Sequence, residues 1–129
     1  MARIDAGDRI MTTKHFWLGS GDTIACSHCG ALNLDDMFWH HMERVEALRD
    51  NVGFPLRMTC GHRCPAHNAI VGGAERSIHL EFATDLQPSN RDPDRLEKMF
   101  ETAEIMDFDG IGKYNTFVHL DSRGFLDRP

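Results

Sequence analysis

The spacing of apolar residues along the chain predicts two main helices. The first is expected over residues 35–51, where apolar side chains recur every three or four positions and form one stripe. Asp35 or Asp36 can cap its start. The second is expected to begin at Asp92-Pro93, because a capping residue is followed there by a proline at the first helical position. The apolar side chains that these helices should bury are Phe38, Met42, Val45, Leu48, Leu96, Met99, Phe100 and Ala103.

Shorter signals predict strands and turns around these helices. Residues 1–12 carry little periodic signal, so we expect a flexible arm there and the folded domain over residues 13–129. The mixed order of helices and short strands favours a single compact domain of the α+β class over a parallel doubly wound sheet. Strands are expected over residues 56–59, 83–86, 105–108 and 116–120, a short helix over residues 65–71, and turns at Gly72, Gly73, Gly110 and Gly112.

Composition narrows the classes of function. The formal net charge is −6, and the 14 Lys and Arg residues are scattered, which argues against a nucleic-acid binder. The longest apolar stretches are only a few residues, too short to cross or anchor in a membrane. The first residues lack the apolar segment of a secretory signal, so we expect synthesis in the cytoplasm and another exit route for any extracellular action.

Four cysteines occur as two close pairs, Cys26-x2-Cys29 and Cys60-x3-Cys64. Two pairs about thirty residues apart are compatible with a structural zinc site, and in an oxidising compartment they are compatible with two disulfides. Four reduced, partly buried thiols are a third interpretation, because the second spacing is loose. The cysteines therefore leave the function open.

The eight histidines of this acidic chain prompt a search for a metal site. His40 and His41 lie on the first expected helix and are interpreted as surface or half-buried residues. His79 and His119 differ from the others because an acidic residue lies near each, Asp85 after the first and Asp121 after the second. Two histidines and one carboxylate, with one position left for water, form the ligand set of a hydrolytic zinc site.

Several separated blocks of sequence add a stronger signal, because they occur together in one order. They are Thr13-Lys14-His15-Phe16, Cys26-Ser27-His28-Cys29-Gly30, Gly61-His62-Arg63-Cys64-Pro65, Val71-Gly72-Gly73-Ala74, Ser77-x-His79 and Phe117-Val118-His119-Leu120-Asp121. In this order the chain resembles the zinc D-alanyl-D-alanine carboxypeptidase family, which also contains peptidoglycan endopeptidases and phage endolysins. The resemblance extends over residues 13–124 and implies a compact α+β domain with a small antiparallel sheet that carries zinc.

The resemblance also implies roles for individual residues. His79, Asp85 and His119 match the zinc ligands of the family. Arg63 matches the arginine that grips the substrate, a role suited to a guanidinium that can bind a carboxylate through two parallel hydrogen bonds. A structural salt bridge is the alternative for Arg63. Ser77 is interpreted as a substrate contact or as the cap of a turn.

The chain departs from the family pattern at two places. In the family the aspartate usually follows the first histidine by seven positions, with a glycine between them, whereas Asp85 follows His79 by six positions without a glycine. Because six residues of straight strand would separate the two by roughly 20 Å, the chain must bend after His79. Many relatives have an acid where Thr116 stands, so Asp121 is expected to be the general base or to orient a histidine ligand, with Glu81 as a further candidate base.

These observations predict a zinc peptidase that hydrolyses the stem peptide of bacterial peptidoglycan, as a carboxypeptidase or an endopeptidase. The short chain resembles phage-encoded members, either endolysins or virion-associated enzymes, and is expected to act as a monomer on the cell wall after release or within a virion. The alternative is a catalytically inactive zinc domain of the same fold that serves as a binding or structural module. A third interpretation is a module whose zinc is held by the four cysteines and whose target is unrelated to the cell wall.

Overall fold

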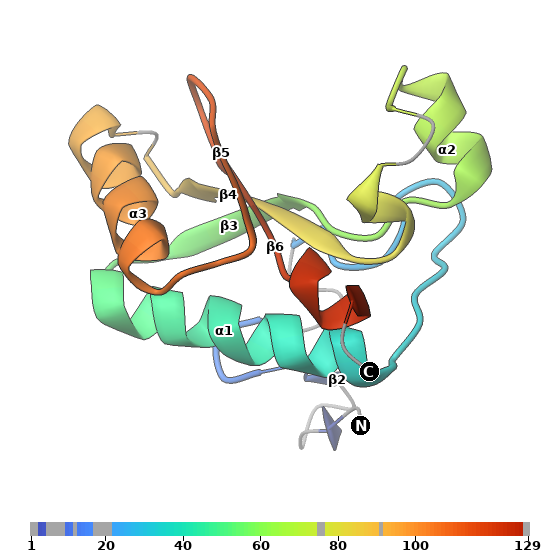
Figure 1. Cartoon of the computed structure of the whole chain (residues 1–129), viewed down its shortest axis with the longest axis horizontal. Coiled ribbons are helices and arrows are strands. Elements are labelled where there is room, and N and C mark those ends of the chain that lie inside the picture. Colours follow the sequence, from blue (N-terminus) through green and yellow to red (C-terminus); the bar gives the residue numbers. More distant parts are fainter. Residues whose placement is uncertain are drawn as a thin grey trace.

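The computed structural model describes residues 3–4, 10–11, 13–16, 22–74, 77–90 and 92–127. Within these residues the fold is α+β, with three α-helices and a four-stranded antiparallel sheet (Figure 1). The helices are α1 (Asp36–Val52), α2 (Pro65–Ile70) and α3 (Pro93–Ile105), with the 3-10 turns η1 (Ile78–Leu80) and η2 (Arg123–Asp127). The strands of the sheet are β3 (Leu56–Cys60), β4 (Ala83–Pro88), β5 (Gly110–Lys113) and β6 (Val118–Asp121).

Helix α1 begins and ends where the sequence predicts. The Asp35 side chain accepts a hydrogen bond from the backbone N–H of Phe38 at 3.0 Å and caps the first turn. Gly53 follows the helix with φ of 77°, in the left-handed region that glycine adopts most readily. The four apolar residues of the predicted stripe are fully buried, so this helix covers the core.

The sheet has the strand order β3-β4-β6-β5, and every neighbouring pair is antiparallel. Successive side chains alternate between its two faces. One face packs with α1, which runs below the sheet in Figure 1, and Leu96, Met99 and Ala103 of α3 belong to the same core. The sheet residues buried in the core include Met58, Leu86, Val118 and Leu120. The face turned away from α1 is therefore left for polar side chains.

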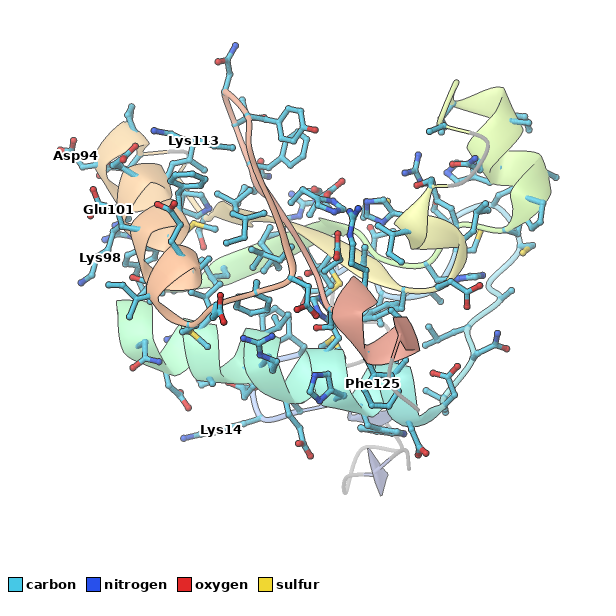
Figure 2. The ribbon with its side chains drawn as sticks, in the orientation of Figure 1. Lys14, Asp94, Lys98, Glu101, Lys113 and Phe125 are labelled. Carbon is cyan, nitrogen blue, oxygen red and sulfur yellow. The ribbon has the colours of Figure 1, made fainter. Side chains whose placement is uncertain are left out.

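His41 is a polar exception within the core. It lies on α1, is fully buried, and its ring nitrogens hydrogen bond with Ser122 Oγ at 2.7 Å and Thr84 Oγ1 at 3.0 Å. Burial lowers its pKa to about 3, although nearby Asp121 acts in the opposite direction. The prediction of a surface or half-buried residue is wrong for His41. The neighbouring His40 is half-buried and stacks on Phe125 of η2, labelled in Figure 2.

One predicted strand, over residues 105–108, is contradicted by the structure, because helix α3 extends to its first residue. Asp92 caps the helix as expected, but the helix continues to Ile105, so residues 105–108 do not form a strand. Ile105 is 84% exposed, and Asp107 has φ of 61°, which reverses the chain after the helix. The strand comes later, as β5, which contains both Gly110 and Gly112. The interpretation of these two glycines as turn formers is therefore wrong.

The chain before residue 13 is described only in part. Strand β1 (Arg3–Ile4) pairs with β2 (Ile10–Met11), and the remaining residues of the expected arm lie outside the described ranges. Among the helices of the described residues, none is long and apolar enough to cross a membrane.

Candidate metal centre

A row of paired residues crosses the sheet on the face turned away from α1. Cys60 of β3 lies opposite Asp85 of β4, Asp85 lies opposite His119 of β6, and His119 lies opposite Gly112 of β5. The register shifts between Met58 and Cys60, so that Cys60 rather than Thr59 stands beside Asp85. Such a bulge redirects a side chain, and here it brings a thiol to the same row as a carboxylate and an imidazole.

His79 reaches this row from outside the sheet. It lies in η1, whose preceding residue Ser77 accepts a hydrogen bond from the His79 backbone N–H at 3.3 Å. The chain then turns at Glu81 and enters β4 at Ala83. The expected bend after His79 is therefore confirmed, and a single 3-10 turn makes it without glycine. The His79 side chain is buried beside Asp85.

Two imidazole nitrogens converge on one carboxylate oxygen. Asp85 Oδ1 lies 3.3 Å from His79 Nε2 and 2.9 Å from His119 Nδ1. The opposite nitrogen of each ring is also held: His79 Nδ1 donates to the Gly61 carbonyl at 2.7 Å, and His119 Nε2 donates to Asp121 Oδ2 at 2.9 Å. Ligands about 2.0–2.1 Å from a tetrahedral zinc ion are about 3.3 Å apart. Both distances come close to that spacing, and the outer hydrogen bonds fix which nitrogen of each histidine faces inward.

Charges in this cluster favour a cation. Burial acts to lower the pKa of His79, but its hydrogen bonds with Asp85 and Cys60 raise that pKa to about 9. The pKa of His119 is also raised: burial acts to lower it, but the hydrogen bonds that His119 donates to Asp121 and Asp85 outweigh that effect. Burial acts to raise the pKa of Asp85, yet the two histidines hold it at about 2. The carboxylate stays ionised, and positive charge beside it is stabilised.

Cys60 is a neighbour of the cluster that the sequence did not indicate. Ligand atoms of Cys60, His79 and Asp85 all lie within 4.8 Å of one another. The Cys60 thiol lies 3.6 Å from His79 Nδ1, which is the nitrogen that donates to Gly61. It therefore stands on the outer side of the His79 ring, away from the nitrogen that faces Asp85. The pairing of Cys60 with Cys64, suggested by their spacing, is not what the fold produces.

Asp121 is held in place from several sides. Its side chain is fully buried, and Arg123 donates to it from Nε at 2.8 Å, from Nη2 at 2.6 Å and from the backbone N–H at 3.1 Å. Burial acts to raise the pKa of Asp121, but the hydrogen bonds from Arg123 and His119 hold it well below its usual range. Gly110 lies opposite Asp121, and a Cβ atom at Gly110 would come within 2.1 Å of Asp121 Oδ2. Sequence reasoning missed both Arg123 and this reason for a glycine.

A cleft of about 830 Å³ opens above the row. Arg63 lines it, donating from Nη2 to Ser77 Oγ at 3.0 Å and from its backbone N–H to the His79 carbonyl at 2.8 Å. No ion pair joins Arg63 to a carboxylate among the described residues, so its guanidinium has no structural salt bridge there. The residues lining the cleft are Arg63, Ala74, Ser77, Ile78, His79, Asp85, Asp109, Gly110, Ile111, Gly112, Tyr114, Phe117, His119 and Arg123.

Two of the positions considered for the proton-transferring group lie elsewhere. Glu81 is exposed, and its backbone carbonyl accepts a hydrogen bond from His62 Nδ1 at 3.1 Å. Thr116 is exposed in the turn between β5 and β6. Neither belongs to the lining of the cleft in the described part of the chain.

The cleft also carries an aromatic wall. Tyr114 and Phe117, at the end of the β5–β6 hairpin, stack with their ring centroids 4.5 Å apart. Lys113, at the end of β5, points toward α3 in Figure 2 and forms an ion pair with Glu97. The hairpin is thus anchored to α3 on one side and presents two rings to the cleft on the other.

Comparison with known proteins gives one match. Residues 21–121 match the sequence model of the family described as Peptidase M15. No curated protein and no solved structure matches the chain.

Proposed function

Because the chain belongs to the peptidase M15 family of zinc metallopeptidases, we propose that it cleaves the stem peptide of peptidoglycan with zinc held by His79, Asp85 and His119. The observation that carries the proposal is the convergence of His79 Nε2 and His119 Nδ1 on Asp85 Oδ1. The outer nitrogens are both occupied, by Gly61 and Asp121, so the inner nitrogens are the ones available to a metal.

The three ligands suit a hydrolytic centre, because two histidines and one carboxylate leave a coordination position open. Zinc in such a site supplies Lewis acidity for polarising a peptide carbonyl and acidifying water. The protein residues determine where that chemistry acts. The ligands lie at the floor of the cleft, so the peptide bond must enter from the side lined by Arg63 and the β5–β6 hairpin.

Arg63 is proposed to bind a carboxylate of the substrate. Its guanidinium is half-buried, and its Nε has no hydrogen-bond partner among the described residues. Arg63 lines the cleft with Nη2 held by Ser77, so a substrate carboxylate that enters the cleft would pair with the positive charge of the guanidinium. A stem peptide carries such carboxylates, at its end for a carboxypeptidase and along its length for an endopeptidase.

Asp121 is proposed to orient His119 rather than to transfer protons. A general base must hold a proton during the reaction, whereas the hydrogen bonds from Arg123 keep Asp121 ionised and burial keeps it out of contact with solvent. Its hydrogen bond to His119 Nε2 instead fixes the ring orientation and increases the basicity of Nδ1.

The test is an assay on purified peptidoglycan fragments, with and without a chelator, followed by mass spectrometry of the products. We expect release of D-alanine or of a shortened stem peptide, abolished by the chelator and restored by zinc. His79→Ala and His119→Ala should lose this activity and most of the zinc affinity, whereas His40→Ala, outside the cleft, should retain both. The alternative of an inactive zinc domain predicts chelatable zinc at the same ligands with no hydrolysis of any fragment. Full retention of zinc in the His79 and His119 double variant would refute the assignment of the ligands.

A further inference from the structure

Three of the four cysteines meet away from the peptidase cleft. The thiols of Cys26, Cys29 and Cys64 all lie within 4.8 Å of one another. All are reduced, and their exposure ranges from buried Cys26 through half-buried Cys64 to exposed Cys29. Cys60 belongs instead to the row beside Asp85, so the fold divides the cysteines three to one.

The backbone around these thiols is shaped to hold a metal. Residues 26–30 form a tight turn in which the Gly30 N–H donates to the Cys26 carbonyl at 2.7 Å, and Gly30 has φ of 76°. The Cys64 N–H points to Cys26 Sγ at 3.4 Å, and the His67 N–H points to Cys64 Sγ at 3.4 Å. Hydrogen bonds from backbone N–H groups favour thiolates, the form in which cysteine binds metals.

Two imidazoles flank the thiols. His28 Nδ1 lies 3.8 Å from Cys64 Sγ, and the His28 ring stacks on that of His67 with centroids 5.8 Å apart. The spacing Cys64-x2-His67 repeats that of Cys26-x2-Cys29, so each half of the cluster offers two donors three positions apart. Three thiolates and one histidine are a common ligand set of structural zinc sites.

We propose that Cys26, Cys29 and Cys64 bind a second, structural zinc ion, with one imidazole of the stacked pair His28 and His67 as the fourth ligand. In a tetrahedral site the sulfur atoms lie about 3.8 Å apart, and a sulfur and a nitrogen about 3.6 Å apart. The thiols within 4.8 Å and the His28 nitrogen 3.8 Å from Cys64 therefore need only small movements to close on an ion.

This ion would join two segments that support the cleft. The loop before α1 already contacts the segment after β3, because the His62 N–H donates to the Ile24 carbonyl at 2.9 Å. The approach is so close that a Cβ at Gly61 would lie 2.3 Å from that carbonyl oxygen. The joined segment carries the Gly61 carbonyl, which orients His79, and Arg63, which lines the cleft. Zinc at the cysteines would thus hold the wall of the cleft without contacting substrate.

The proposal is tested by counting metal ions in protein purified under reducing conditions. We expect two zinc ions in the wild type and one in Cys29→Ser, Cys64→Ser and His79→Ala, with two retained in the control His40→Ala, which lies outside both clusters. Cys29 is exposed, so its variant remains informative even if the Cys64 variant fails to fold. Replacement of zinc by Co²⁺ should give a sulfur-to-metal charge-transfer absorption that disappears in Cys29→Ser and persists in His79→Ala.

The outcomes separate this site from the peptidase centre. Loss of zinc in His79→Ala with none lost in Cys29→Ser would overturn the second site alone. A disulfide among the three thiols, found by mass spectrometry in protein purified under reducing conditions, would do the same. One of the variants His28→Ala and His67→Ala should weaken zinc binding at the cysteines by at least about tenfold. An unchanged affinity in both would refute the histidine ligand.

Discussion

Replacing Gly110 by alanine should damage the proposed metal centre, although the new methyl group does not touch its ligands. Gly110 lies on β5 directly opposite Asp121, and the added Cβ would stand 2.1 Å from Oδ2 and 2.5 Å from both Cγ and Oδ1. An ordinary van der Waals contact needs at least 3.4 Å, so the carboxylate or the strand must move by roughly 1.3 Å, the difference between 3.4 and 2.1 Å. The carboxylate cannot swing into solvent, because it is fully buried and held by Arg123.

A shift of this size would break the 2.9 Å hydrogen bond between Asp121 and His119. Overpacking and the loss of this hydrogen bond together should cost about 1–3 kcal/mol of unfolding free energy. At about 3–5 °C for each kcal/mol in a chain of this length, the melting temperature should fall by roughly 3–15 °C. Without its carboxylate partner, His119 should bind zinc about 10–100-fold more weakly.

The assay is thermal unfolding together with zinc competition against a chromogenic chelator. The matched control is Gly124→Ala, whose Cβ would also meet a carboxylate, that of Asp109 at 2.8 Å. Asp109 is exposed and can move into solvent, so the control should lose little stability and no zinc affinity. Gly110→Ala with the melting temperature and zinc affinity of the control would refute the proposed positioning role of Asp121.

Three further predictions concern single residues. Asp121→Asn should weaken zinc binding by about 10–100-fold while turnover recovers at saturating zinc; turnover that stays 10²–10⁴-fold low with zinc fully bound would instead make Asp121 the general base. Arg63→Lys keeps the charge but loses the planar fork, so peptide hydrolysis should fall with zinc content and melting temperature unchanged; an equal loss of stability would make Arg63 structural. The pKa of His41 is near 6.5 in the unfolded chain and about 3 in the folded protein. Between these two pH values the unfolded chain binds a proton that the folded protein does not, so the free energy of unfolding falls as the pH falls. His41→Gln should flatten denaturant-measured stability over this range by up to about 1.4 kcal/mol per pH unit, whereas His40→Gln should keep the wild-type slope.

The helices could be predicted because their signals are local. The apolar stripe and its flanking residues Asp35 and Gly53 identify α1, and Asp92-Pro93 identifies the start of α3. The strand predicted over residues 105–108 was wrong because the apolar residues Ile105, Met106 and Phe108 are as compatible with a strand as with the end of a helix. Only the positive φ at Asp107 and the exposure of Ile105 separate the two readings, and both depend on the packed fold.

The candidate ligands could be predicted because the resemblance to a family identified them in the sequence. The residues that contact these ligands could not be predicted, because they are brought together by the pairing of strands. His79, Asp85 and His119 do meet, and the required bend after His79 follows from elementary strand geometry. The position of Cys60 beside Asp85 depends on a bulge, which no spacing in the sequence indicates. The glycine at position 110 reads as a turn former until its strand partner, Asp121, is known.

The row of paired residues across the sheet, which includes Asp85 and His119, also determines when the proposed zinc ligands assemble during folding. Its members are distant along the chain, with Asp85 and His119 separated by 34 positions. His79 and Asp85 are neighbours in sequence, but His119 joins them only when β6 has paired with β4. Closing such a long loop is among the slower events of folding. A partly folded chain therefore has only some of the proposed zinc ligands in place. For zinc held as proposed, tight binding therefore reports the finished sheet, and denaturant should release the metal in the same cooperative transition that separates the strands.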